Sequence, residues 1–329
     1  MRIIVDAFGG DNAPLEIIKG CQMAVEEYGV DITLTGDKNI IKKTAIENCI
    51  SLNKIKIVHT DVVISPDDDA SSVVKEKKNS SMGLGFQLLA EGEGDAFVSA
   101  GNSGALVMGS SLIIKRIKGV KRPAFAPIMP KAEGCFMLVD GGANNEVRPE
   151  MLQQFAIMGS IYMNKVMGID NPRVGLANVG TEEHKGGPLQ QETYELLKKT
   201  PLNFIGNVEG RDIPGNACEV LVTDGFNGNL ILKTYEGVAM ELMGKIKDIF
   251  KKNIKNKVAA AMIMSDLKIL AKEMDYNEYG GAAIMGINKP VFKAHGSSKA
   301  KTIKNAIKLT KQFVEGNVVE EISRNIANL

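Results

Sequence analysis

Five short loops combine glycine with polar side chains in a way that suits an anionic ligand. They cover residues 6–14, 99–105, 140–145, 178–187 and 224–229. Glycine lets a backbone approach a ligand closely, and a glycine-rich loop that opens a helix presents unpaired N–H groups at the positive end of the helix dipole. The sequence therefore predicts that these loops bind phosphate.

The loop at residues 99–105 has the best composition for phosphate. Its glycines permit close approach, and its serine and asparagine side chains add hydrogen-bond donors. We therefore expect phosphate to contact Ser99, Gly101, Asn102, Ser103 and Gly104, with Lys185 of the fourth loop as the cation. A solvated loop lysine is the alternative for Lys185.

Three of the loops begin with an aspartate within two residues of the end of a predicted strand, namely Asp6, Asp140 and Asp224. A bare carboxylate would repel phosphate. We therefore expect these side chains to organise their loops by accepting hydrogen bonds from loop backbones.

The sequence lacks the common cofactor and metal motifs. It has no G-x-x-x-x-G-K-[ST] loop, and residues 83–88 lack the third glycine of the dinucleotide fingerprint. The three histidines lie far apart and the four cysteines occur singly, so we predict no metal site and expect the reduced thiols of a cytoplasmic protein. A net charge of +1 without tryptophan argues against nucleic-acid binding.

A serine hydrolase is an alternative interpretation of the second loop. Residues 101–105 nearly form the G-x-S-x-G turn that exposes a nucleophilic serine between a strand and a helix. Ser103 would be the nucleophile, and Asp224 and His295 would complete the chain order of a triad. However, Ala105 replaces the last glycine, and a serine there also suits a simple helix cap.

Apolar, β-branched runs alternate with segments of helical period, which predicts one α/β domain over residues 1–329 with a mainly parallel sheet. The predicted strands are Ile3–Val5, Ile32–Leu34, Ile55–Val58, Ala96–Val98, Phe136–Val139, Val174–Ala177, Phe204–Ile205 and Val220–Val222. The predicted helices are Pro14–Tyr28, Ser103–Lys115, Pro149–Val166, Pro188–Lys198, Asn229–Lys252, Val258–Lys272 and Ser298–Phe313. Because the carboxyl ends of parallel strands share one edge of a sheet, we expect the loops to meet there.

The segment from Gly244 to Met264 is strongly basic, with six lysines against one aspartate. Its apolar residues recur near helical spacing, which is typical of a helix that lies on an anionic membrane. We expect a protruding helical pair over residues 229–275 that contacts the membrane through Lys251, Lys252, Lys255, Val258, Met262 and Ile263. Ordinary helices packed on the sheet or across a dimer contact are the alternative. We expect no membrane-spanning segment and no signal peptide.

The loops also carry a family resemblance that runs in order from Met1 to about Ile307. Residues 5–14, 99–105, 122–123 and 138–144 resemble motifs of the phosphate acyltransferase family. So do residues 178–186, 204–212, 224–229 and 295–298. Thr181 departs from the family, in which an acidic residue is usual, and leaves Glu182 and Glu183 as candidates for any carboxylate role there.

This resemblance implies a Rossmann-like three-layer α/β/α sandwich, a homodimer and no metal or organic cofactor. It implies that a long-chain acyl group passes from acyl carrier protein to inorganic phosphate, and that the acyl phosphate serves phospholipid synthesis. It also implies a cytoplasmic enzyme that associates peripherally with the membrane, where a glycerol-3-phosphate acyltransferase consumes the product.

Such a reaction needs positioning more than strong acids or bases. Phosphate is substantially dianionic near neutral pH and a simple thiol has a pKa of about 8.5, so phosphate attacks the thioester directly and a thiolate leaves. Donors must then stabilise the oxyanion. We expect Asn102, Asn144 or Asn229 in that role, and His184 or His295 to protonate the sulfur.

A second basic run has no acidic residue within it and comprises Lys115, Arg116, Lys118, Lys121 and Arg122. Acyl carrier protein is acidic, so this run is a predicted docking patch, with a solvated loop as the alternative. The rival functions are a phosphate acyltransferase that uses coenzyme A thioesters, a nicotinamide-dependent dehydrogenase and a catalytically silent scaffold that binds acyl carrier protein.

Overall fold

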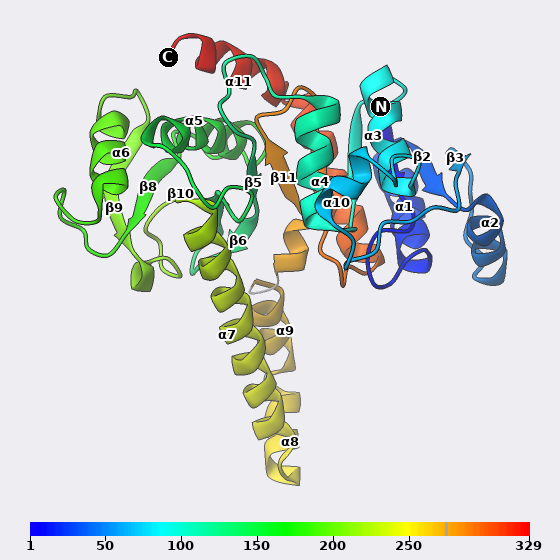
Figure 1. Cartoon of the computed structure of the whole chain (residues 1–329). Helices are drawn as coiled ribbons and strands as arrows, with labels where there is room; N and C mark the ends of the chain where they lie inside the picture. Colours follow the sequence, from blue (N-terminus) through cyan, green and yellow to red (C-terminus); the bar gives the residue numbers. More distant parts are fainter. Residues whose placement is uncertain (274–275) are drawn as a thin grey trace.

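The computed structural model describes residues 1–273 and 276–329 and contains two mainly parallel sheets (Figure 1). The first has the strand order β3 (Ile55–His59), β2 (Asp31–Gly36), β1 (Arg2–Asp6), β4 (Ala96–Ser99), β12 (Val291–Lys293), β11 (Ala282–Met285) and β5 (Ala124–Ala126). The second has the order β6 (Ile128–Pro130), β7 (Cys135–Val139), β10 (Val220–Val222), β8 (Arg173–Asn178) and β9 (Asn203–Glu209). The predicted α/β class and parallel pairing are confirmed.

The chain crosses from one sheet to the other within a few residues. β5 pairs with β11 in the first sheet, and β6 pairs with β7 in the second. Pro127 lies between β5 and β6 and lacks a backbone N–H, so it suits a break between two ladders. Its carbonyl accepts a hydrogen bond from the Leu138 N–H at 3.0 Å, which keeps the crossing close to β7.

All eight predicted strands are present, but the sequence analysis missed β5, β6, β11 and β12 and expected one sheet. The missed strands contain only three or four residues. So short a run shows no clear alternation, because the period of a strand is two residues.

The helices cover both sheets and supply one long projection. They are α1 (Leu15–Tyr28), α2 (Lys38–Glu47), α3 (Ser81–Glu91), α4 (Ser103–Gly109), α5 (Pro149–Lys165), α6 (Pro188–Lys198), α7 (Gly225–Lys251), α8 (Ile254–Met262), α9 (Met264–Glu273), α10 (Ala300–Glu315) and α11 (Val318–Ala327). A π-helical turn, Ser110–Ile114, continues α4. The helices α2, α3 and α11 were not predicted.

The helix α7 extends away from the body, and α8 and α9 return beside it (Figure 1). The predicted helix Val258–Lys272 is in fact two helices. The first begins early because Asn253 caps it, with its side-chain oxygen accepting the Asn256 N–H at 2.9 Å. Residues 274 and 275 of the predicted excursion lie outside the described residues. None of the helices in the described ranges has the length and apolar character needed to cross a membrane.

A buried charge network joins the amino ends of the central strands of the second sheet. Lys131 is 6% exposed and donates to Glu219 at 2.9 Å and to Asn216 at 2.8 Å. Arg173 donates to both carboxylate oxygens of Glu219, at 3.0 and 2.6 Å. Burial alone would raise the pKa of Glu219, but these hydrogen bonds lower it to about 2.

Glu219→Gln should therefore destabilise the protein by about 3 kcal/mol at pH 7, because Lys131 would be left buried without its counter-charge. The ionised carboxylate contributes stability above the unfolded pKa of about 4.3. That contribution is lost as pH falls toward the folded pKa of about 2. Urea unfolding at pH 7 and pH 3 should show the difference between variant and wild type shrinking in acid.

Glu93→Gln is the matched control, because Glu93 pairs with Arg2 at an exposed site. It should cost less than about 1 kcal/mol at either pH. If Glu219→Gln lowers the free energy of unfolding by the same amount at pH 7 and pH 3, the assignment of an ionised pair is contradicted.

Candidate active site

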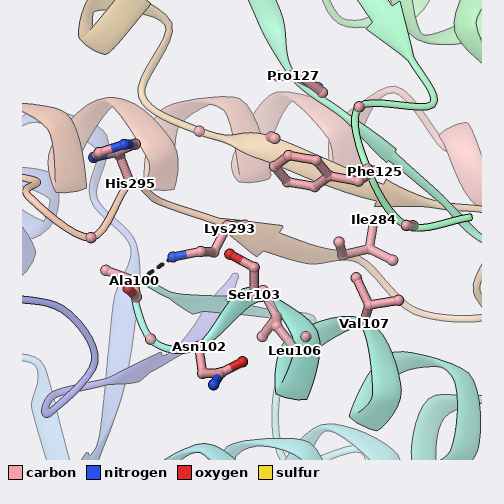
Figure 2. Close-up of a pocket in the computed structure, with 18 of the residues that line it drawn as sticks. Ala100, Asn102, Ser103, Leu106, Val107, Phe125, Pro127, Ile284, Lys293 and His295 are labelled. Carbon is pink, nitrogen blue, oxygen red and sulfur yellow. Dashed lines mark hydrogen bonds between the residues drawn. The ribbon is translucent and has the colours of Figure 1, made fainter. Parts of the chain in front are cut away.

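A cavity of about 1220 Å³ lies where elements of the two sheets meet (Figure 2). Its polar lining comes from the loops after β1, β4, β7 and β12, and α4 and α7 supply two further walls. The predicted site residues among the lining are Gly101, Asn102, Ser103, Gly104, Arg122, Asn144, Asn229 and His295. Loops far apart in the sequence therefore converge on one cavity.

Glycine allows the loops after β1, β4 and β12 to touch. A Cβ on Gly9 would lie 2.6 Å from the Gly101 nitrogen, and one on Gly10 would lie 2.8 Å from the Gly296 oxygen. Gly10 also has a φ of +93°, which side chains disfavour. Any larger residue at these positions would separate the loops.

Asp6 ties the first two of these loops together. Its carboxylate accepts a hydrogen bond from the Ser99 hydroxyl at 2.8 Å and from the Phe8 N–H at 3.1 Å. Burial raises the pKa of Asp6, and the hydrogen bonds oppose that shift. On the other side, the Asn12 amide donates to the Ser297 carbonyl at 3.0 Å and so joins the loop after β1 to the loop after β12.

Lys293, at the end of β12, is a polar residue of the cavity that the sequence analysis missed. Its ammonium group donates to the carbonyls of Ala100 and Ala294, both at 2.8 Å (Figure 2). Burial lowers the pKa of Lys293 to about 8, although Asp6 and Asp11 favour the charged form. The available signal was a lysine that ends a short apolar run just before the His295 motif.

Asp140 organises the opposite side of the cavity with five hydrogen bonds. One oxygen accepts the N–H groups of Phe125, Gly142 and Ala143 at 2.9, 3.1 and 3.0 Å. The other accepts the backbone and side-chain N–H groups of Asn144, both at 2.7 Å. Burial raises the pKa of Asp140, against the effect of these donors. Phe125 belongs to β5, so this carboxylate links the two sheets.

The three asparagines predicted to face the oxyanion have different surroundings. Asn102 caps α4 by accepting the Ala105 N–H, and its amide donates to the Pro66 and Asp68 carbonyls at 3.1 and 3.2 Å. The Asn144 amide donates to Asp140 and to the Pro123 carbonyl. The Asn229 side chain lines the cavity without a hydrogen bond to any described residue. Asn229 is therefore the amide that has donors to spare.

The polar end of the cavity adjoins an apolar wall. The Ser103 hydroxyl points toward Lys293, whose ammonium group extends to Ala100, while Leu106, Val107, Phe125 and Ile284 gather on the other side (Figure 2). A ligand that fills this cavity therefore meets charged and hydrogen-bonding groups at one end and hydrocarbon at the other.

The structure does not bring the loop at residues 178–187 to this cavity. Lys185 and His184 are not among the residues that line it. Their backbone carbonyls accept hydrogen bonds from Asn178 at 3.1 Å and Gln191 at 2.7 Å, within their own region. Glu182 and Glu183 lie in the same exposed loop. The roles assigned to Lys185 and His184 stay predictions.

The triad of the hydrolase interpretation is not assembled in the described residues. Asp224 caps α7, and its carboxylate accepts the backbone and side-chain N–H groups of Asn227 at 2.8 and 2.6 Å. The Nδ1 atom of His295 instead lies 2.8 Å from the Ser297 hydroxyl. No hydrogen bond therefore links Asp224 to His295, as a triad requires.

The basic run at residues 115–122 forms an ordered loop near the cavity. Its cations are exposed, while Ile117 and Val120 between them are buried. The Gln154 side chain holds the loop through the Lys121 N–H at 2.8 Å and the Gly119 carbonyl at 3.0 Å. Arg122 also lines the cavity.

Comparisons with known proteins agree with this architecture. The family described as "Fatty acid synthesis protein" matches residues 1–321. A phosphate acyltransferase of Thermoanaerobacterium thermosaccharolyticum is 48% identical over 99% of this chain and 97% of its own length. A phosphate acyltransferase of Clostridioides difficile is 44% identical over 99% of this chain and 96% of its own length. The chain belongs to the phosphate acyltransferase family.

Solved structures with the same fold have a lower sequence identity to this member of the phosphate acyltransferase family than the relatives above. The EutD phosphotransacetylase of Staphylococcus aureus has a TM-score of 0.63 at 18% identity, over 95% of this chain and 94% of its own. A branched-chain phosphotransacylase of Enterococcus faecalis has a TM-score of 0.59 at 14% identity, over 95% and 99%. At such identities the likeness concerns the fold alone.

Asp140→Ala should cost at least about 3 kcal/mol of stability, because it strands several part-buried donors between the two sheets. Denaturant unfolding would measure this cost. Asp37→Ala is the control, because Asp37 caps the surface helix α2 with two hydrogen bonds. It should cost only about 1 kcal/mol. Equal losses for the two variants would show that Asp140 is no more than a local cap.

Proposed function

We propose that this protein transfers a long-chain acyl group from acyl carrier protein to inorganic phosphate and so makes acyl phosphate for phospholipid synthesis. Family membership supports acyl transfer to phosphate. The observation that carries the proposal is the cavity, which combines glycine-rich polar loops, of a composition that suits an anion, with an apolar wall. An enzyme that joins phosphate to a fatty acyl chain requires both.

Phosphate would bind at the polar end, against the loop that follows β4. The backbone N–H groups of Ser103 and Gly104 have no hydrogen-bond partner among the described residues, and the Ser103 hydroxyl faces the cavity (Figure 2). Lys185 stays a predicted ligand, although it does not line the cavity.

The acyl chain would lie along the apolar wall, with its thioester carbonyl toward the phosphate. A phosphate oxygen attacks the carbonyl carbon, the resulting oxyanion collapses, and the carbon–sulfur bond breaks to release a thiolate. Asn229 is the best-placed predicted donor to the oxyanion, because its amide is not engaged elsewhere. His295, which lines the same cavity, would protonate the sulfur.

A large cavity supports a long acyl chain, since its volume of about 1220 Å³ exceeds the usual range for small ligands. The ordered basic loop at residues 115–122 supports an acidic donor protein, because its exposed cations lie beside Arg122 at the cavity. Complementary charges of this kind speed encounter and set orientation.

The purified protein should cleave palmitoyl-acyl carrier protein only when inorganic phosphate is present. Hydroxylamine should trap the acyl phosphate that forms, because an acyl phosphate is a mixed carboxylic–phosphoric anhydride and transfers its acyl group readily to that nucleophile. Palmitoyl-coenzyme A in place of the carrier-protein donor should react less efficiently, as judged by kcat/KM.

Two results would redirect the proposal. Thioester cleavage that does not depend on phosphate would favour the Ser103 hydrolase interpretation, and Ser103→Ala should then abolish it. No cleavage of either donor would favour the scaffold interpretation. Equal kcat/KM values for the two donors would favour the coenzyme A enzyme.

The helical projection supports contact with a membrane. At its tip Val258, Met262 and Ile263 are 56, 81 and 42% exposed, beside the exposed Lys251, Lys252 and Lys255. Exposed apolar side chains next to cations suit the interface of an anionic bilayer. Farther up α7, the exposed apolar residues Val238 and Leu242 would be covered in the predicted homodimer. The glycerol-3-phosphate acyltransferase partner stays a prediction.

Charge reversal at Lys251, Lys252 and Lys255 should weaken binding to phosphatidylglycerol vesicles by roughly 100-fold or more, at about 1 kcal/mol per lysine. Vesicle sedimentation would measure this effect. The matched control reverses Lys38, Lys42 and Lys43 on the exposed face of α2, far along the chain from the tip. Unchanged binding by the tip variant, or equal loss in the control, would remove the tip from the membrane contact.

A further inference from the structure

Lys293 has an unusual position for a lysine. Its side chain lies at the end of β12, an interior strand of the first sheet, and the residue is only 8% exposed although it lines the cavity. Its two hydrogen bonds go to the Ala100 and Ala294 carbonyls. An ammonium group has three N–H donors, so one donor remains after these two bonds.

The surroundings fix this ammonium group where phosphate would bind. Ala100 belongs to the same loop as Ser103 and Gly104, so the two carbonyl bonds hold the charge beside that loop. Arg122 and Lys233 also line the cavity, but both are exposed. A cation removed from water interacts more strongly with an anion than a solvated one does. Lys293 is therefore the cation of the cavity that is best arranged to hold phosphate.

We infer that Lys293 is a catalytic residue of this site and that its ammonium group binds the phosphate that attacks the thioester. The inference rests on the proposed function for the identity of the anion. Held by two carbonyls, the ammonium group does not have to reorganise when charge passes from the phosphate to the carbonyl oxygen. Lys293 thus orients the phosphate and offsets its negative charge, in a cavity that Asp11 also lines.

A structural role is the competing explanation, because Lys293 also ties β12 to the loop after β4. Lys289 shows what a purely structural lysine looks like in the same region. It is half-buried, donates to the Leu89 carbonyl at 2.7 Å, and does not line the cavity. Lys289→Met is therefore the matched control for Lys293→Met.

The first experiment measures the apparent KM for phosphate and, without any acyl donor, the stabilisation of the full chain by phosphate in thermal unfolding. Lys293→Met should raise the phosphate KM roughly 10- to 100-fold, as expected for a lost charge-assisted hydrogen bond. The KM for the acyl donor should stay near the wild-type value. Phosphate should no longer stabilise Lys293→Met, whereas Lys289→Met should keep both the wild-type KM and the stabilisation.

The second experiment uses Lys293→Arg and does not depend on the methionine variant folding. The charged groups that act on Lys293 are Asp6 at the end of β1 and Asp11 in the loop after it, and His295 lines the same cavity. Because the pKa of Lys293 is lowered to about 8, phosphate affinity in the wild type should fall as pH rises through that value. A guanidinium group stays protonated, so the arginine variant should lack this alkaline loss.

The outcomes separate the inference from the proposed function. A wild-type phosphate KM in Lys293→Met, an equal loss in Lys289→Met, or the same alkaline loss in Lys293→Arg would overturn the role of Lys293. If phosphate stabilises the wild type through Lys293 but no acyl phosphate forms, the phosphate site stands and the proposed reaction fails. If acyl phosphate forms with an unchanged KM in Lys293→Met, the reaction stands and the inference fails.

Discussion

The arrangement of the two sheets depends on the hydrogen bonds that the Asp140 carboxylate accepts. This carboxylate accepts hydrogen bonds from its own loop after β7 and from Phe125 of β5, so it joins the edge of one sheet to the other. Asn144, held by this carboxylate, accepts the Gly225 N–H at the start of α7. A Cβ on Gly228 would lie only 1.8 Å from the Asp140 carbonyl oxygen, so α7 packs directly against this loop. The wall that α7 supplies to the cavity follows from these contacts.

The other side of the cavity rests on backbone contact rather than on one side chain. Gly9, Gly10 and Gly101 let the loops of three adjacent strands touch, and Asp6 bonds across them. The two sides use most of their polar groups for their own construction, including the amides of Asn102 and Asn144. Groups with donors to spare, such as those of Asn229 and Lys293, are then the ones available to a substrate.

Sequence patterns predicted eight of the strands but missed four short ones and the helices α2, α3 and α11. Each of the eight predicted strands exists, since a buried run bounded by glycine or aspartate is a local signal. β5 and β6 hold three residues each on either side of Pro127, too few to show a period. Their pairing turns one expected sheet into two: β5 pairs with β11, more than 100 residues away, whereas β6 pairs with the neighbouring β7. The family resemblance, by contrast, was visible because its loop motifs are local and ordered along the chain.

The sequence by itself determined the α/β class, the glycine-rich polar loops and the family, because each of these depends on residues that are neighbours along the chain. Only the tertiary structure decided which loops share a cavity. It placed Lys293 against Ala100, 193 residues away, and left Lys185 out of the lining. Strand order makes that selection. β12 lies beside β4 and brings its lysine to the loop at residues 99–105, whereas the loop after β8 belongs to the other sheet. Hydrogen bonding between distant strands is a property of the folded chain, and no local pattern encodes it.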